Sequence, residues 1–325
     1  MVSSNNQVST TFSSAEQHTK AQAESLQIFR KVGAGACGAV FGQDGQSLVW
    51  KLAKSEGELI SYFDAHLQLI KAAEGVCNLP TSALVTERIL PLPSTTRNLL
   101  VEKFCAPRIK EKACADIANT DCLVRVYLGS MQGKTNMKFF SLRNFKLHLN
   151  HMLEIKLDVE AIVRRMGIAM AVLHWAAKTD ARDVEFVLGS STRKTTAAVH
   201  DTNPRTIEPE TYTGPLSFRD EVFFSRVTEL WILDFNQVRT ITMDDEGVKL
   251  AVEAWRINDP HFPKPLRETP AERHVWEAFV ITYLEASDAI LKEEKIGKDA
   301  LALPRKFIHG ITEAERTRMM SRMGD

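Results

Sequence analysis

The sequence predicts a mixed α/β (α+β) protein in which a β-rich N-terminal part precedes a mostly helical C-terminal part. Three observations favour this fold class: a glycine-rich turn at 33–38 lies between two strand-like apolar segments, residues 148–177 carry an apolar stripe at helical spacing, and an apolar strand at 229–233 comes late in the chain. At 325 residues the chain can bury one large core or two lobes.

The chain divides by composition into three parts. Residues 1–25 are rich in Ser, Thr, Asn and Gln, which predicts a disordered leader. Residues 26–104 form the expected β-rich lobe, and residues 105–325 form the expected helical lobe. Within these parts the patterns predict helices at 56–74, 148–177, 268–296 and 312–323, strands at 82–90, 98–104 and 229–233, and a long loop at 191–220.

Composition excludes several classes of protein. Lys+Arg and Asp+Glu both number 41, so net charge does not indicate a nucleic-acid or membrane partner. The five cysteines form no Cys-x-x-Cys pair and accompany no histidine doublet, which disfavours zinc, and no metal site is predicted. The odd cysteine count, with neither a signal peptide nor a membrane-spanning apolar run, predicts a cytoplasmic protein.

The pattern Gly33-x-Gly35-x-x-Gly38-x-Val40 precedes a strand rather than a helix, which argues against a dinucleotide-binding fold. In a strand–turn–strand flap, glycines let backbone amides approach phosphate oxygens. Lys51 follows within an apolar strand, where a protein kinase carries its phosphate-pairing lysine. The three glycines and Lys51 are therefore candidate nucleotide-binding residues. The alternatives are that the glycines form a simple turn and that Lys51 is a surface lysine.

The segment Trp231-Ile-Leu-Asp-Phe-Asn236 places Asp234 at the end of an apolar strand, as kinases place their metal-binding aspartate. Glycine flap, strand lysine and strand-end aspartate occur in kinase order, so the chain resembles a protein kinase with a bilobal fold. The catalytic loop is altered. A kinase catalytic loop carries an aspartate that acts as the base and, five residues later, an asparagine that binds the metal. If residues 184–188 are the strand that follows this loop, Asp183 takes the asparagine position and Lys178 takes the base position. An ammonium group cannot act as a base unless its pKa is strongly lowered.

Three carboxylates follow the long predicted helix. Asp180, Asp183 and Glu185 lie close together in sequence, and the kinase-like order brings Asp234 beside them. Such a group can bind a cation, hold an ammonium or guanidinium, or share a proton. These four residues are the candidate catalytic residues. The alternative is that loop carboxylates only cap turns.

A basic and aromatic segment is a candidate nucleic-acid interface, because bases stack on rings while cations meet phosphates. A strand with buried phenylalanines and solvated lysines is the alternative. The cations are Lys134, Lys138, Arg143 and Lys146, and the interleaved rings are Phe139, Phe140 and Phe145.

The block Asp183-Val-Glu-Phe-Val-Leu-Gly189, with Trp231–Asn236 and Asn258-Asp-Pro-His-Phe-Pro-Lys-Pro265, resembles a fungal family often labelled as zinc-finger proteins. That family is similar to the arginine-containing cyclodipeptide synthases. The resemblance implies acyl transfer from arginyl-tRNA and a second aminoacyl-tRNA into a diketopiperazine, in fungal secondary metabolism. It places Asp180, Asp183 and Glu185 in the active site and requires no cofactor.

Two alternatives remain open. The chain could be an ATP-dependent small-molecule or protein kinase that uses Lys51, Asp234 and Mg²⁺, against which the altered loop counts. It could also be an inactive pseudokinase-like binding module, against which the density of carboxylates counts.

Overall fold

The structure, a computed structural model, describes residues 29–34, 38–43, 48–53, 83–143, 145–192, 226–293 and 297–323. The described residues up to 88 belong to one compact unit, and those from 89 onward belong to another. The predicted leader, Gly35, the predicted helix at 56–74 and the predicted loop beyond residue 192 lie outside the described residues. None of the described helices carries an apolar stretch long enough to cross a bilayer.

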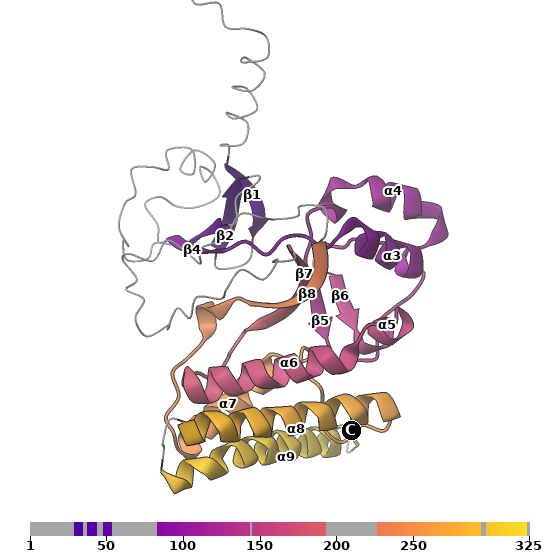
Figure 1. The fold of residues 1–325 in the computed structure, drawn as a ribbon. Coiled ribbons are helices and arrows are strands. Elements are labelled where there is room, and N and C mark those ends of the chain that lie inside the picture. The colour runs from indigo at the N-terminus through magenta and orange to yellow at the C-terminus, as the bar shows by residue number, and fades with distance from the viewer. Residues whose placement is uncertain are drawn as a thin grey trace, which may run out of the picture. The chain divides into compact units, whose positions relative to one another are not determined.

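The first unit contains one antiparallel sheet with the strand order β1-β2-β3-β4 (Figure 1). The strands on either side of the glycine-rich segment are both present and pair with each other, as the sequence predicts. Lys51 on β3 lies opposite Val40 on β2. The four strands are β1 (Phe29–Ala34), β2 (Gly38–Gln43), β3 (Leu48–Ala53) and β4 (Ala83–Glu87).

Gly38 has a packing role in this sheet. A Cβ atom at this position would lie 2.7 Å from the backbone oxygen of Leu52 on the neighbouring strand. A side chain would therefore push the two strands apart. Gly33 lacks such a neighbour, since a Cβ there would meet only Val40 at 4.0 Å. Close strand packing alone accounts for the glycine at position 38.

The second unit is built on a mixed sheet with the order β6-β5-β7-β8. Strands β5 and β6 run parallel, whereas β7 is antiparallel to both β5 and β8. The buried face of the sheet includes Val124 and Val126, which belong to one large hydrophobic core. The strands are β5 (Val124–Tyr127), β6 (Phe145–His148), β7 (Glu185–Thr192) and β8 (Arg226–Leu233).

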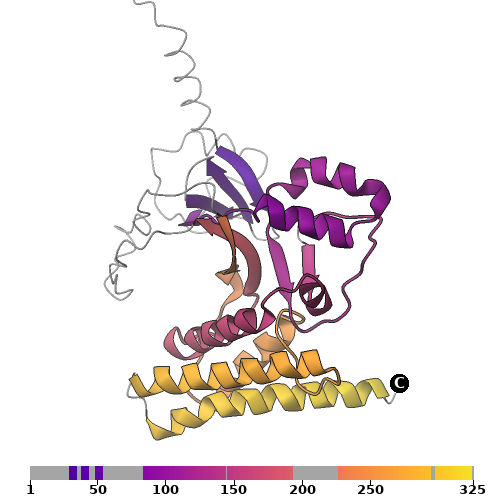
Figure 2. The same cartoon turned by 45° about the vertical axis from the view of Figure 1, so that its right-hand side comes forward.

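Helices surround this sheet, and the described chain is thus a mixed α/β protein. Figures 1 and 2 show α6 and α8 side by side, with α9 next to α8. At Gly167 of α6 the two helices come so close that a Cβ would lie 3.1 Å from the Phe279 oxygen. The helices are α3 (Ser94–Phe104), α4 (Lys110–Ala115), α5 (Leu149–Glu154), α6 (Val159–Ala171), α7 (Asp245–Ile257), α8 (Pro270–Glu293) and α9 (Leu303–Met323).

The prediction of one continuous helix at 148–177 is wrong, because two helices, α5 and α6, occupy this range. Helix α5 ends before Lys156, whose φ of 55° is incompatible with a right-handed helix. Helix α6 then starts anew, because the Asp158 side chain accepts a hydrogen bond from the Ala161 N–H at 2.9 Å. A π-helical turn, Val172–Ala176, closes the segment.

The strand predicted at 98–104 is also wrong, since these residues form the end of α3. Leu100, Val101 and Phe104 are its buried residues, at a spacing that suits one face of a helix. The predicted strand at 82–90 corresponds to β4, and the predicted helix at 268–296 corresponds to α8. The C-terminal helix α9 starts nine residues earlier than predicted.

Two core histidines are held neutral. Burial lowers the pKa of His174 to about 3 and that of His261 to about 4. His174 Nδ1 lies 2.9 Å from the Tyr283 hydroxyl, and His261 Nδ1 donates to the Val126 carbonyl at 3.0 Å. Protonating either ring would place a charge in the core.

We expect the stability to fall as the pH drops from 6.5 to 4. The unfolded chain takes up protons at histidines near pH 6.5, whereas the folded chain does not bind a proton at His261 until about pH 4. Each such histidine contributes a slope of about 1.4 kcal/mol per pH unit to the free energy of unfolding in this window. Urea unfolding of His261→Asn, whose amide can still donate to Val126, should show a shallower slope. The exposed control His309→Asn should match the wild type, and equal slopes in all three proteins would contradict the argument.

Candidate active site

The two segments that carry the predicted catalytic residues have an unusual backbone. Seven non-glycine residues of the described chain have a positive φ, and four of them lie in these segments. Such conformations cost energy and persist only where surrounding contacts hold them, which is common at functional sites. The four residues are Lys178 (54°), Ala181 (54°), Asp183 (62°) and Asp234 (70°).

Asp180 joins the loop that follows α6 to the segment that follows β8. Its carboxylate accepts from the Arg239 backbone N–H at 2.9 Å and from Arg239 Nε at 2.5 Å. It also accepts from the Arg182 N–H at 3.0 Å, and the Asp180 N–H donates to the Arg239 carbonyl at 2.9 Å. Asp180 is 1% exposed. This carboxylate is therefore fully engaged inside the protein.

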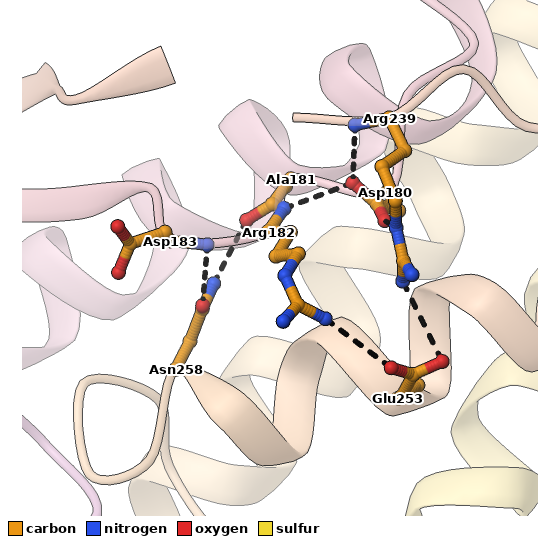
Figure 3. Close-up of polar contacts among 7 residues, drawn as sticks. All are labelled: Asp180, Ala181, Arg182, Asp183, Arg239, Glu253 and Asn258. Carbon is orange, nitrogen blue, oxygen red and sulfur yellow. Dashed lines mark hydrogen bonds and ion pairs between the residues drawn. The ribbon is translucent and has the colours of Figure 1, made fainter. Parts of the chain in front are cut away.

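Glu253 of α7, whose side chain is 51% exposed, extends this pair (Figure 3). Its two carboxylate oxygens face Arg182 Nη1 at 3.2 Å and Arg239 Nη2 at 3.6 Å. The hydrogen bond that Arg239 donates to Asp180 is the main cause that raises the pKa of Arg239, with Glu253 adding to it. Two guanidinium groups and two carboxylates thus form a charge-balanced network behind the loop.

Asn258, which directly follows α7, fixes the conformation of the loop. Its side-chain oxygen accepts from the Asp183 N–H at 2.8 Å, and its amide donates to the Ala181 carbonyl at 2.8 Å. Asn258 is buried, and its two hydrogen bonds hold two residues with positive φ. The carboxylate of Asp183 points away from Asn258 (Figure 3) and accepts from Gln237 Nε2 at 2.5 Å.

Glu185 and Asp234 lie at the same end of the strand pair β7–β8. Glu185 is the first residue of β7 and lies opposite Leu233, the last residue of β8, which Asp234 follows. The carboxylate of Glu185 forms an ion pair with Arg125 of β5 at 2.9 Å. Because Gln237 brings Asp183 to the segment after Asp234, three of the four predicted carboxylates gather at this strand end.

The structure thus divides the predicted catalytic set. Asp183, Glu185 and Asp234 lie at the strand end, while Asp180 turns to Arg239. Among the described residues, no three His, Cys, Asp or Glu side chains are arranged to hold a metal ion. Catalytic roles for all four residues stay predictions.

The other predicted binding residues belong to different segments of the chain. Gly33, Gly38 and Lys51 belong to the first unit, whose placement relative to the second is not determined. The four predicted nucleic-acid-binding cations belong to the second unit, and all are exposed.

Sequence reasoning did not identify the residues that hold the carboxylates in place. Arg239, Gln237 and Arg125 carry no periodic or motif signal, because each meets its partner only through the tertiary fold. Asn258 opens the Asn-Asp-Pro-His block that the resemblance rests on, so that block was the one available signal.

Residues 230–295 match the family model of a domain of unknown function that is described as "zinc finger protein". This stretch runs from the end of β8 through α7 and Asn258 to the C-terminal end of α8, so it includes Asp234, Arg239 and Glu253. It contains two histidines and no cysteine, and so it cannot supply a Cys₂His₂ or Cys₄ ligand set. No curated protein and no solved structure matches the chain.

We expect Arg239→Met to be clearly more destabilising than Arg182→Met. The first change leaves the buried Asp180 carboxylate without its guanidinium partner, which costs about 1–3 kcal/mol or more for a charged group. The second removes only a solvent-facing pair with Glu253, worth up to about 1 kcal/mol. Urea unfolding at pH 7 measures both, and equal losses would show that the Asp180–Arg239 pair has no special weight.

Proposed function

We propose that this protein is a tRNA-dependent cyclodipeptide synthase built on a kinase-like scaffold with an altered catalytic loop. It would join arginine from arginyl-tRNA with a second aminoacyl residue into a diketopiperazine. The observation that carries the proposal is the gathering of Asp183, Glu185 and Asp234 at one end of β7 and β8, where Asp183 and Asp234 have positive φ. The enzyme would work in the cytoplasm, where charged tRNAs are found.

The order of the elements supports the kinase-like scaffold. Paired strands flank the glycine-rich segment, Lys51 lies on the third strand, and a helix leads through a loop into two antiparallel strands that end in Asp234. The loop itself departs from a phosphoryl-transfer site. Lys178 is exposed in a left-handed conformation, and the buried Asp180 is occupied by Arg239. Neither is suited to accept a proton from an attacking hydroxyl group.

The proposed reaction needs positioning and proton transfer rather than activation, because an aminoacyl ester is already activated. The α-amine of one aminoacyl group attacks the ester carbonyl of the other, an amide bond forms, and the C–O bond to the first tRNA breaks. The free amine of the resulting dipeptidyl ester then attacks its own ester carbonyl, which closes the ring and releases the second tRNA. Each attack frees one proton from the amine and returns one to the leaving ribose oxygen.

The partners of the carboxylates indicate how the work would be divided. The Asp183 carboxylate accepts a hydrogen bond from the neutral Gln237 amide and is half-buried, which suits a proton acceptor for the amine. Glu185 is held by Arg125 and would fix the local charge. A second carboxylate would bind the substrate guanidinium in a bidentate pair, and Asp234 at the adjacent strand end is our candidate. Asp180 would position the loop.

The test is an assay with pre-charged tRNAs, including arginyl-tRNA, and no ATP, read by mass spectrometry of the product. We expect an arginine-containing cyclic dipeptide from the wild type. Asp183→Asn should reduce its formation at least a hundredfold, because a positioned acid–base group contributes about 10²–10⁴-fold. Glu185→Gln should also reduce it strongly, because the change leaves the Arg125 guanidinium without its carboxylate beside the site. Thermal unfolding checks that the variants stay folded.

Glu246→Gln on the exposed first turn of α7 is the matched control and should retain full activity, since the Glu246 carboxylate forms an exposed ion pair with Lys249. Near-full activity of both Asp183→Asn and Glu185→Gln would overturn the proposed site. Lys51 on β3 favours a second candidate, an ATP- and Mg²⁺-dependent kinase. Release of the ATP γ-phosphate, with no cyclic dipeptide from charged tRNAs, would decide for that candidate. An inactive binding module would show neither reaction.

A further inference from the structure

Residues 123–153 contain no Asp or Glu, although acidic and basic residues are equally frequent in the whole chain. The stretch carries five cations. Arg125 is paired with Glu185. In the described part of the chain, the other four form no ion pair, and all four are exposed. They are Lys134, Lys138, Arg143 and Lys146.

One aromatic ring among these cations faces solvent. Phe139 is 98% exposed. Its neighbour Phe140 packs against the core, with its ring 5.5 Å from that of the buried Phe145. Of three phenylalanines close in sequence, two therefore serve the fold, and the third presents an uncovered face. Single exposed apolar side chains are common. The exposure of Phe139 therefore indicates a binding site only if the loop that carries it is held in place.

That loop is firmly fixed at its N-terminal end. The Asn150 side chain accepts from the Gly133 N–H and donates to the Gly133 carbonyl, both at 2.9 Å. A Cβ at Gly133 would overlap the ring of His151, whose Nε2 donates to the Lys134 carbonyl at 3.0 Å. Helix α5 thus holds Gly133 and Lys134 through two side chains.

The middle and the C-terminal end of the loop are fixed as well. Met137 exchanges backbone hydrogen bonds with Phe104 and Ala106, at 2.9 and 3.0 Å. The buried Asn119 accepts from the Leu142 N–H at 2.7 Å. A loop anchored at these points loses little conformational entropy when it binds a ligand, which favours affinity. Contacts on both sides of Phe139 therefore hold its loop in a preformed conformation.

We propose that this surface, the 134–146 platform, binds single-stranded RNA. An unpaired base would stack on Phe139, and the adjoining phosphates would meet Lys134, Lys138 and Arg143. A duplex hides its base faces within the stack and would not use the ring. An acidic peptide would satisfy the cations but has no flat face to lay on an isolated phenylalanine. The partner that fits both features is an unpaired strand.

One cation of the platform, Lys146, lies opposite a residue that contacts the candidate active site. Lys146 on β6 lies opposite Arg125 on β5, and Arg125 reaches Glu185 at 2.9 Å. A strand lying on the platform could therefore run toward the carboxylates at the end of β7 and β8. This inference rests on the proposed function in one respect, since there the bound strand would be the unpaired acceptor end of a charged tRNA.

The experiment measures binding of a fluorescent, unstructured 12-nucleotide RNA and of uncharged tRNA by anisotropy over a range of salt concentrations. Phe139→Ala should weaken binding about 5- to 150-fold, as expected for the loss of one stacked base. Lys138→Gln/Arg143→Gln should lower the slope of log affinity against log salt by about 1.4, or about 0.7 for each phosphate contact on a single strand.

Ile281→Ala removes a half-exposed apolar side chain of α8, and Lys249→Gln/Lys306→Gln removes two distant cations; both controls should bind like the wild type. Unchanged affinity of Phe139→Ala, or equal binding of a 12-base-pair RNA duplex, would overturn the platform. RNA binding that depends on Phe139, without any cyclic dipeptide in the charged-tRNA assay, would support the platform and refute the synthase. Product formation without RNA binding at 134–146 would refute the platform alone.

Discussion

The buried pair of Asp180 and Arg239 is the constraint on which the candidate site depends. Through three hydrogen bonds this pair joins the loop after α6 to the segment after β8. The neighbouring Thr179 and Thr240 continue the link as an isolated β-bridge. Taking the carboxylate out of water is costly and is offset only because a guanidinium and two backbone N–H groups surround it. The segment that enters β7 and the segment that leaves β8 are thereby held together, and their acidic residues come to the same strand end.

The sequence predicted those parts of the fold that arise from local patterns. The strands around the glycine-rich segment, β8 with Asp234 after it, and α8 follow from period-two or period-3.6 apolar spacing, and all are present. The end of α3 was predicted as a strand because the three consecutive apolar residues Leu99-Leu-Val show neither helical nor strand periodicity. An apolar run of that length suits a buried strand as well as a helix end. The break between α5 and α6 was hidden, since apolar side chains keep their spacing across Lys156.

The candidate site was foreseen in its composition but not in its geometry. Counting carboxylates located Asp180, Asp183 and Glu185, yet sequence spacing could not show that Asp180 faces inward and Asp183 outward. The backbone between them has positive φ values at Ala181 and Asp183, which the spacing of residues in the sequence does not reveal. The partner that stabilises both, Asn258, is more than seventy residues away in sequence. Contacts of this kind have no local signature.

The strained loop is consistent with the acyl-transfer role that we propose, because it is fixed by many partners. Each positive φ at a non-glycine residue costs about 1–3 kcal/mol, and Asn258, Arg239 and Gln237 supply hydrogen bonds that offset the cost. A loop held by so many fixed partners keeps its carboxylates in one arrangement. Reactions of activated esters gain most from such fixed positioning, because bringing two bound groups together in the right orientation accounts for about 7–11 kcal/mol of an intramolecular advantage. A preformed RNA-binding surface at 134–146 would also contribute to positioning. It would present the aminoacyl ester of a bound tRNA to side chains that are already in place.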